Sequence, residues 1–384
     1  MHPLIEEMLS TIDLIGDLSA DGLRGARERQ EKLAKPTGAL GSLEDISVQL
    51  AGITGKIKNS VKNQAIVIMC ADNGVCEEGV ASAPQSVTLS QTINFTRGLT
   101  GVSSMAKASG IDLLVVDCGV KLPIPEELYS SEMTEHICND DACSKGLTKK
   151  IVNRRLADGT ANLAKEPAMS PANAVKALMI GLEAVDNIKR AGYDIFGVGE
   201  MGIGNTTTSA CVLSALTGKD ASVVVGRGGG LNDAGLQKKI DIVREAASKQ
   251  NPNEVLQILC EIGGFDLAAM TGAFLGAAYY KLPVVIDGYI SAVAALCAAR
   301  LAPKAKNFMF ASHNSTEPGY KIAIEELGLK PMFDLGMRLG EGSGCPIAFK
   351  IIEQATFAMN GMATYDEGSI DADYLEERKE GNFF

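Results

Sequence analysis

The chain has 384 residues, of which 46% are apolar, 5% are aromatic and none is tryptophan, so we expect a large aliphatic core. Its formal net charge is −11 and it has no basic stripe, which argues against a nucleic-acid partner. We find no signal segment and no apolar run that could span a bilayer, and nine scattered cysteines are typical of reduced thiols, so we expect a cytoplasmic protein without a membrane partner.

Helical spacing of apolar residues predicts helices in residues 1–33 and 40–53, and continuous apolar runs then predict buried strands. The predicted strands span 65–71, 111–117, 194–199, 221–226, 283–288 and 307–312. Helices are predicted between them and after them, at 172–191, 235–250 and 346–359, whereas 126–150 is polar and reads as a surface excursion. This alternation predicts an α/β fold with a mainly parallel sheet and helices on both faces.

Polar or glycine-rich segments follow most of the predicted strands. Because open parallel sheets bind ligands at the carboxyl ends of their strands, we expect these segments to converge on one edge. The segments are 72–74, 199–207, 226–230, 287–289 and 312–314.

Two of these segments are suited to holding a phosphate group. Glycines in 199–207 and 226–230 let backbone amides approach a ligand closely. Asn205, Thr206 and Thr207 can cap a helix whose amino end attracts a phosphate, and Lys239 can add a point charge. The alternative is that both clusters only form tight turns.

Glu200 and Glu341 each stand inside a glycine-rich turn, a setting that suits a general base. The apolar neighbours Met337 and Leu339 would raise the pKa of the Glu341 carboxyl. The alternative is that these glutamates are surface carboxylates on turns.

Other chemistries have weaker support in the sequence. Residues 197–202 match the G-x-G-x-x-G dinucleotide motif of a dehydrogenase, but no strand ending in an acidic residue follows at the usual distance. His136, Cys138 and Cys143 lack the paired spacing of a zinc site, so we expect no metal. His313 as a catalytic acid and Cys345 as a nucleophile are further alternatives.

Several motifs together resemble one family, in the same order from about residue 30 to about residue 360. They are KPTG at 35–38 with LGSLE at 40–44, ADNGV at 71–75 with EGV at 78–80, GTAN at 159–162, GEMGIGNTT at 199–207, GGFDL at 263–267 with MTG at 270–272, and LGEGSG at 339–344. The chain is similar to the nicotinate-nucleotide:dimethylbenzimidazole phosphoribosyltransferases, which assemble the lower ligand of cobalamin.

The resemblance implies a Rossmann-like large domain and a small helical domain built from both chain ends. We place the large domain at residues 30–340 and the small domain at residues 1–29 and 341–384. It also implies a homodimer that needs no cofactor. The reaction it implies moves ribose 5-phosphate from nicotinate mononucleotide to a benzimidazole-type base and gives the α-riboside 5-phosphate and nicotinate.

The same resemblance implies roles for individual residues. Glu341 would be the catalytic base and Glu200 a second active-site carboxylate. The nucleotide and its phosphate would be held by Gly202, Gly204, Asn205, Thr206, Gly228, Gly229, Gly230, Lys239 and Ser312. The acceptor base would lie against Gln91, Pro84, Met337 and Leu339.

The chain departs from the family pattern at Asn73, where many members have histidine, and at Ala83, which replaces a small polar residue. These departures leave open whether the acceptor is benzimidazole, a methylated benzimidazole, a purine or a phenol. A non-catalytic sensor of the same ligands is the other alternative, although both glutamates are present.

Overall fold

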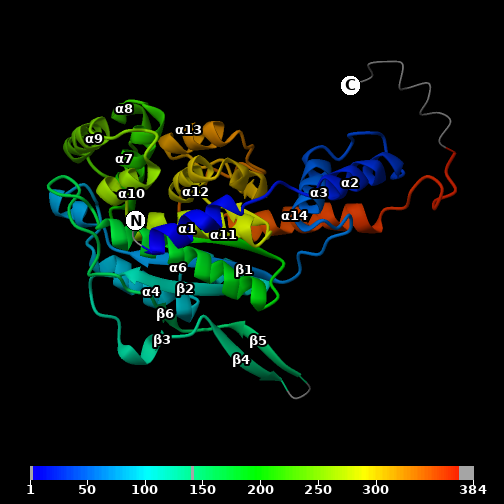
Figure 1. Cartoon of the computed structure of the whole chain (residues 1–384), viewed down its shortest axis with the longest axis horizontal. Coiled ribbons are helices and arrows are strands. Elements are labelled where there is room, and N and C mark those ends of the chain that lie inside the picture. The colour runs from blue at the N-terminus through cyan, green and yellow to red at the C-terminus, as the bar shows by residue number, and fades with distance from the viewer. Residues whose placement is uncertain (1–2, 140–141, 372–384) are drawn as a thin grey trace. The chain divides into compact units, whose positions relative to one another are not determined.

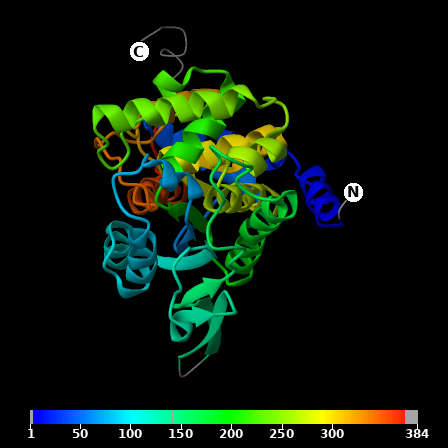
Figure 2. The same ribbon diagram turned by 90° about the vertical axis from the view of Figure 1, so that its left-hand side faces the viewer.

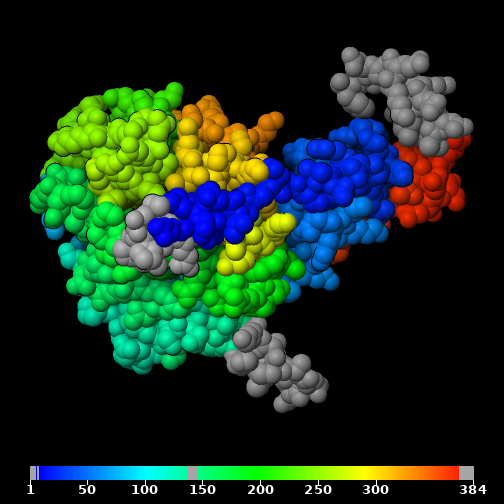
Figure 3. Space-filling view, viewed as in Figure 1, coloured from blue at the N-terminus to red at the C-terminus, as the bar shows by residue number. Residues whose placement is uncertain are grey.

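The computed structural model describes residues 3–139 and 142–371 and contains two compact units. The first comprises Met1–Gly16 and Asn63–Ala348, and the second comprises Asp17–Lys62 and Phe349–Phe384. We expected residues 1–29 to lie in the small domain. Helix α1 (Pro3–Asp13) instead packs against helices of the first unit, where Met8 is buried, and Figure 3 shows its residues as dark blue atoms on the surface of that unit.

A seven-stranded parallel sheet forms the centre of the first unit, in the order β3-β6-β2-β1-β7-β8-β9 (Figure 1). The strands are β1 (Gln64–Ala71), β2 (Asp112–Gly119), β3 (Tyr129–Ser130), β6 (Ile151–Asn153), β7 (Ile195–Met201), β8 (Val284–Ile286) and β9 (Met309–Ala311). The central strands β1 and β7 are buried along their whole length, as their apolar runs predict. The predicted parallel α/β fold is confirmed.

Helices cover both faces of this sheet (Figure 2). Helix α11 packs against β1, β2 and β7, and α6 packs along α11, while α4 and α5 pack against β2. The helices of this unit that follow α1 are α4 (Ser86–Arg97), α5 (Gly101–Ser109), α6 (Pro171–Arg190), α7 (Asn205–Thr217), α8 (Ala221–Val224), α9 (Asp233–Ser248), α10 (Val255–Ile262), α11 (Phe265–Tyr279), α12 (Tyr289–Leu301) and α13 (Pro318–Leu327). Helix α6 begins at Pro171, one residue before the predicted start at 172, because the Ser170 hydroxyl accepts the Asn173 amide at 3.2 Å.

Helices α6 and α11 approach each other closely enough to exclude side chains at their crossing. A Cβ atom on Gly272 would lie 1.9 Å from the carbonyl oxygen of Leu178, and one on Gly181 would lie 2.0 Å from that of Ala269. Both glycines therefore serve the packing of α11 beneath the sheet.

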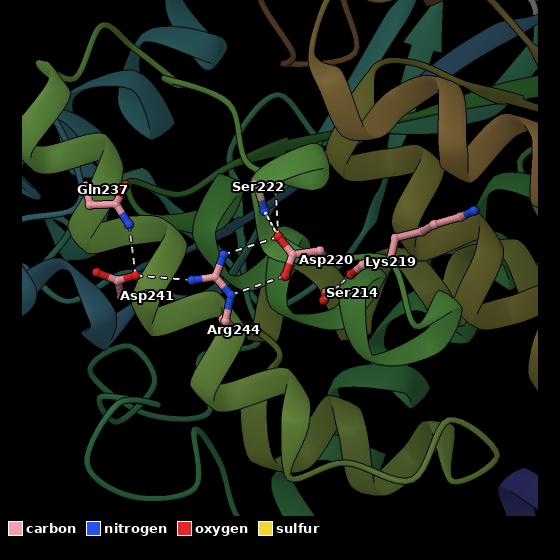
Figure 4. A network of polar contacts seen from close by, with 7 residues as sticks. All are labelled: Ser214, Lys219, Asp220, Ser222, Gln237, Asp241 and Arg244. Carbon is pink, nitrogen blue, oxygen red and sulfur yellow. Dashed lines mark hydrogen bonds and ion pairs between the residues drawn. The ribbon is translucent and has the colours of Figure 1, made fainter.

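The strand predicted at 221–226 is wrong, because residues 221–224 form the short helix α8. The Asp220 carboxylate accepts the backbone amide of Ser222 at 2.9 Å and so caps the helix. The same carboxylate binds Arg244 of α9, whose guanidinium also contacts Asp241 (Figure 4). This network ties together the two helices that flank the glycine-rich loop at 226–230.

The polar segment at 126–150 contains more structure than expected. Strand β3 and the following β6 extend the main sheet, and β4 (Thr134–Asn139) and β5 (Ala142–Leu147) form an antiparallel hairpin. Strands β3 and β6, with two and three residues, are too short to give a periodic pattern. The side chains of His136, Cys138 and Cys143, considered above for zinc, lie outside the described residues.

The second unit is helical. It contains α2 (Ala20–Lys32), α3 (Ser42–Thr54) and most of α14 (Cys345–Gly361), and Ala26, Ala51 and Met359 form a buried cluster. An ion pair joins the buried Lys35 to the partly buried Glu44 at 2.7 Å. Within residues 3–139 and 142–371, no helix of either unit is long and apolar enough to cross a membrane.

Candidate active site

A cavity of about 840 Å³ lies in the first unit, at the carboxyl ends of β7 and β8 and beside segments that follow β1. The strand order reverses direction at β1, the position where open parallel sheets bind ligands. The volume of the cavity is within the usual range for small-molecule sites. The residues that line it are Val80, Ala81, Ser82, Ala83, Val87, Gln91, Glu200, Met201, Gly202, Ile203, Gly204, Asn205, Thr206, Arg227, Gly228, Gly229, Gly230, Asp287, Gly288, Tyr289, Ile290, Ser291, Ser315, Glu317, Arg338, Leu339, Gly340 and Glu341.

Glu341 enters the cavity wall from a turn with an unusual backbone. Its φ angle is 63°, and the flanking Gly340 and Gly342 have φ angles of 83° and 88°. Few residues other than glycine adopt this left-handed region. The turn also lies directly on β7, since a Cβ on Gly199 would lie 2.3 Å from the Glu341 carbonyl oxygen.

The Glu341 carboxylate lies at the amino end of helix α5. Its Oε2 accepts the backbone amide of Val102 at 3.3 Å, and the Gln91 side-chain amide lies 3.5 Å from Oε1. Burial raises the pKa of this carboxyl, while the amides of Val102 and Gly101 act in the opposite direction. The group is therefore a buried carboxylate in the cavity wall with few partners, which suits proton removal from a ligand in the cavity.

Glu200 lies at the end of β7 and forms a hydrogen bond with the same turn. Its Oε1 accepts the Glu341 backbone amide at 3.3 Å, and its Oε2 accepts the side-chain amide of Asn205. Burial, followed by the nearby Asp266 carboxylate, raises the pKa of Glu200 to about 8. Burial also raises the pKa of Asp266 to about 6. The two glutamates, which the family resemblance places in one active site, thus lie in direct contact.

The predicted capping by Asn205 is wrong. Helix α7 begins at Asn205 itself, and the capping position is Gly204, whose φ angle of 96° requires glycine. The Asn205 side-chain amide instead donates to Glu200 and, at 3.2 Å, to Asp266. The amino end of α7 still faces the cavity, because Gly202, Gly204 and Thr206 all line it.

Lys239 is buried and does not itself line the cavity, but it lies next to Thr206, which does. Its ammonium donates to the Thr206 hydroxyl at 2.8 Å and to the Gly226 carbonyl at 3.2 Å. Burial lowers the pKa of Lys239 to about 8, and Glu317 partly opposes this shift. The loop at 228–230 forms the adjoining wall, although it follows helix α8 rather than a strand.

Some predicted site residues do not line the cavity. Ser312 is fully buried, and its hydroxyl donates to the Asp287 carbonyl at 3.0 Å. Pro84 and Met337 precede cavity-lining segments but are not part of the wall, whereas Gln91 and Leu339 are. Sequence reasoning missed Arg338, Glu317 and other wall residues, because side-chain direction in irregular loops follows no period.

The residues of the alternative chemistries are positioned differently. Gly197 and Gly199 lie inside β7, whereas a dinucleotide motif needs its glycines in the turn that follows the strand. His313 is buried, with Nδ1 3.0 Å from the Ser312 hydroxyl, and burial lowers its pKa. Burial raises the pKa of the Cys345 thiol well above its ordinary value. Neither His313 nor Cys345 lines the cavity.

Comparisons with known proteins agree with this geometry. A phosphoribosyltransferase family model matches residues 15–370. A nicotinate-nucleotide–dimethylbenzimidazole phosphoribosyltransferase from Clostridium perfringens is 52% identical over 379 residues, covering 98% of both chains. The chain belongs to this phosphoribosyltransferase family.

Further similar proteins extend the comparison to solved structures. A relative of the same name from Ruminiclostridium cellulolyticum is 46% identical over 362 residues, covering 94% of this chain and 97% of its own. A crystal structure of the enzyme from Thermus thermophilus is 34% identical, with a TM-score of 0.82 over 92% of this chain and 99% of its own. The parallel α/β fold thus occurs in a family of phosphoribosyltransferases.

The buried carboxyl of Glu200 gives this phosphoribosyltransferase a testable pH dependence. An unfolded glutamate loses its proton near pH 4.5, whereas the folded Glu200 keeps it to about pH 8. The folded state therefore binds more protons between these values, so the free energy of unfolding should fall as pH rises through them. Glu200→Gln is expected to flatten this fall by up to about 1.4 kcal/mol per pH unit, measured by urea unfolding between pH 5 and 8.

The matched control is Glu245→Gln, on the exposed face of α9. It should keep the wild-type slope over the same pH range. A Glu200→Gln slope equal to that of the wild type would show that Glu200 is ionised in the folded protein.

Proposed function

We propose that this phosphoribosyltransferase moves ribose 5-phosphate from nicotinate mononucleotide to a ring nitrogen of a benzimidazole-type base, for the lower ligand of a cobamide. The observation that supports the proposal most directly is the Glu341 carboxylate, in the wall of the cavity that also holds the amino end of α7. The names of the similar proteins supply the donor and the acceptor class.

The donor would lie with its phosphate at the amino end of α7 and the loop at 228–230. Backbone amides there, the helix dipole and the Lys239 charge favour a phosphate dianion. Glu317 and Arg338 lie in the same wall, within reach of the rest of the nucleotide. Positioning the sugar in this way leaves its C1′ atom facing the acceptor side of the cavity.

The acceptor would lie between Gln91, Leu339 and the apolar side chains of residues 81–87, with one ring N–H directed at Glu341. Its other ring nitrogen attacks C1′, and the bond from C1′ to the pyridinium nitrogen breaks. The bonding electron pair neutralises the pyridinium, so nicotinate leaves, and the acceptor proton passes to Glu341. Attack opposite the leaving group inverts C1′ and gives the α-riboside.

The test is incubation of the purified protein with nicotinate mononucleotide and a panel of benzimidazoles, purines and phenols. We expect nicotinate release that depends on the base, together with an α-riboside 5-phosphate of the expected mass. Binding of both ligands without a new riboside would identify a sensor instead. The panel also determines the acceptor, which the substitution at Ala83 leaves open.

We propose further that the enzyme acts as a homodimer, as the family resemblance implies, and that it is cytoplasmic. Its free thiols support a reducing compartment; those at Cys70, Cys118 and Cys211, for example, are buried and unpaired. Light scattering of the purified protein tests the dimer, and a monomer at working concentration would contradict it.

Lys239→Met is expected to weaken binding of nicotinate mononucleotide about tenfold or more, because a charge-assisted contribution to phosphate binding is lost. Isothermal titration calorimetry measures this dissociation constant directly. The control is Lys238→Met on the same helix, since that side chain is exposed and pairs with Glu78 at 3.2 Å, whereas Lys239 binds Thr206 of the cavity wall. Equal affinity in the Lys239 variant and the wild type would remove Lys239 from the phosphate site.

A further inference from the structure

The turn that carries Glu341 has a disfavoured backbone conformation, so contacts from its surroundings must stabilise it. Three successive residues, 340–342, have positive φ angles, and the middle one is not a glycine. A left-handed residue with a side chain is disfavoured and persists only when its surroundings fix it. The position of the carboxylate therefore depends on the contacts that hold this backbone.

Asp287 supplies two of those contacts. Its Oδ2 accepts the backbone amide of Gly342 at 2.8 Å, and its Oδ1 accepts that of Gly344 at 2.7 Å. Each carboxylate oxygen thus binds an amide of the turn, immediately after the residue that would remove the proton. Asp287 is 2% exposed, so water competes little for these bonds.

The strand before Asp287 and the strand beside it fix its own position. Asp287 directly follows Ile286, which pairs with Val198 of β7 and with Ala311 of β9. The Ser312 hydroxyl donates to the Asp287 carbonyl at 3.0 Å, which anchors the backbone from the β9 side. Because the sheet fixes Asp287, the Asp287 side chain can hold the turn at a defined position relative to the sheet edge.

No cation lies at hydrogen-bond distance from this carboxylate in the described residues; the nearest basic group in its surroundings is His313 Nδ1, at 3.8 Å from Oδ1. A buried carboxylate without a cation is costly, and a neutral side chain would serve packing alone at lower cost. The two amides of the turn are the contacts that a carboxylate, with two acceptor oxygens, satisfies together.

We propose that Asp287 is a positioning residue of the reaction: its carboxylate clamps the backbone at Gly342 and Gly344 and so holds the Glu341 carboxylate toward the acceptor base. The proposal rests on the proposed function. Asp287 acts through Glu341, so its contribution should disappear when Glu341 can no longer take a proton. A role in general stability, or a direct contact with the donor, gives a different pattern.

The test is a double-mutant cycle on the full-length enzyme. Asp287→Asn keeps the size of the side chain but offers only one acceptor oxygen. We expect it to lower kcat about tenfold or more in the wild-type background and less than about twofold in a Glu341→Gln background, because the two residues act as a unit. The KM for nicotinate mononucleotide should stay within about twofold in both backgrounds.

Each other outcome overturns the proposal. Equal fold-losses in the two backgrounds would assign Asp287 to structure, and a KM for the donor raised at unchanged kcat would assign it to substrate binding. If the wild type releases no nicotinate at all, the proposed function fails before the cycle begins, so the two failures are distinguishable.

Two further variants complete the design. Asp194→Asn is the matched control, because Asp194 accepts the Asn63 amide at 3.0 Å beside the opposite end of β7; it should leave kcat unchanged. If Asp287→Asn does not fold, as shown by its melting curve, Ser312→Ala takes its place in the cycle. It removes the donor to the Asp287 carbonyl and should show the same dependence on Glu341, with a smaller loss. Equal losses with Ser312→Ala in the two backgrounds would overturn the proposal.

Discussion

Replacing Glu341 with glutamine is expected to lower kcat at least about 10²-fold, the usual contribution of a general base. The amide keeps the shape of the side chain and its neighbours at Gln91 and Val102 but cannot accept a proton at neutral pH. Nicotinate release at saturating donor and base measures the loss. The dissociation constant of nicotinate mononucleotide should change little, because the variant leaves the proposed phosphate-binding residues at the amino end of α7 and at 228–230 unchanged.

The matched control for that variant is Glu325→Gln on α13, whose carboxylate is exposed and lies 3.8 Å from Lys321. It should keep full activity. Full activity in Glu341→Gln itself would show that proton removal by this carboxylate contributes nothing to turnover, and the role of the turn would then be positioning of the substrates alone.

Gly272→Ala is expected to lower the free energy of unfolding by about 3 kcal/mol. An alanine inside a helix ordinarily adds about 0.5–1 kcal/mol relative to glycine, so the sign of the effect is diagnostic. The loss arises because the new methyl group would lie 1.9 Å from the Leu178 carbonyl, so α6 and α11 must move apart. Urea unfolding monitored by circular dichroism measures it.

Gly16→Ala provides the comparison, since a Cβ there meets no atom within 4 Å. Its free energy of unfolding should stay within about 0.5 kcal/mol of the wild type. If Gly272→Ala is as stable as the wild type, the helices are not in backbone contact in solution.

The central part of the fold was predictable because its signals are strong and local. The runs at 65–71, 111–117 and 194–199 are long, apolar and followed by turn residues, and each became a strand. The run at 221–226 has the same composition, but Asp220 caps it and Arg244 holds the cap, so it became helical. A contact from a residue so far along the chain cannot be read from the run itself.

The site was predictable to a similar extent. Glu200 lies at a strand end, as the sheet-edge argument predicts, and Glu341 joins it because the turn before α14 packs directly on β7. The sequence could not show that the Glu341 carboxylate binds a backbone amide at the amino end of α5, which lies far before Glu341 in the chain. Nor could it show that Ser312 faces inward while Ser315 reaches the cavity, since no period governs side chains after a strand ends.

The two sides of the cavity come from separate stretches of the chain. Residues 80–91 supply most of the wall that we assign to the acceptor, while residues 202–206 and 227–230 supply the wall that we assign to the donor. The stretch 80–91 spans a short loop and the start of α4, and it carries none of the contacts that hold Glu341 except that of Gln91. A library confined to the wall positions of that stretch other than Gln91 and Ser82, whose hydroxyl lies against Gly229, would therefore vary the proposed acceptor side while the residues proposed to bind the phosphate and to accept the proton stay unchanged.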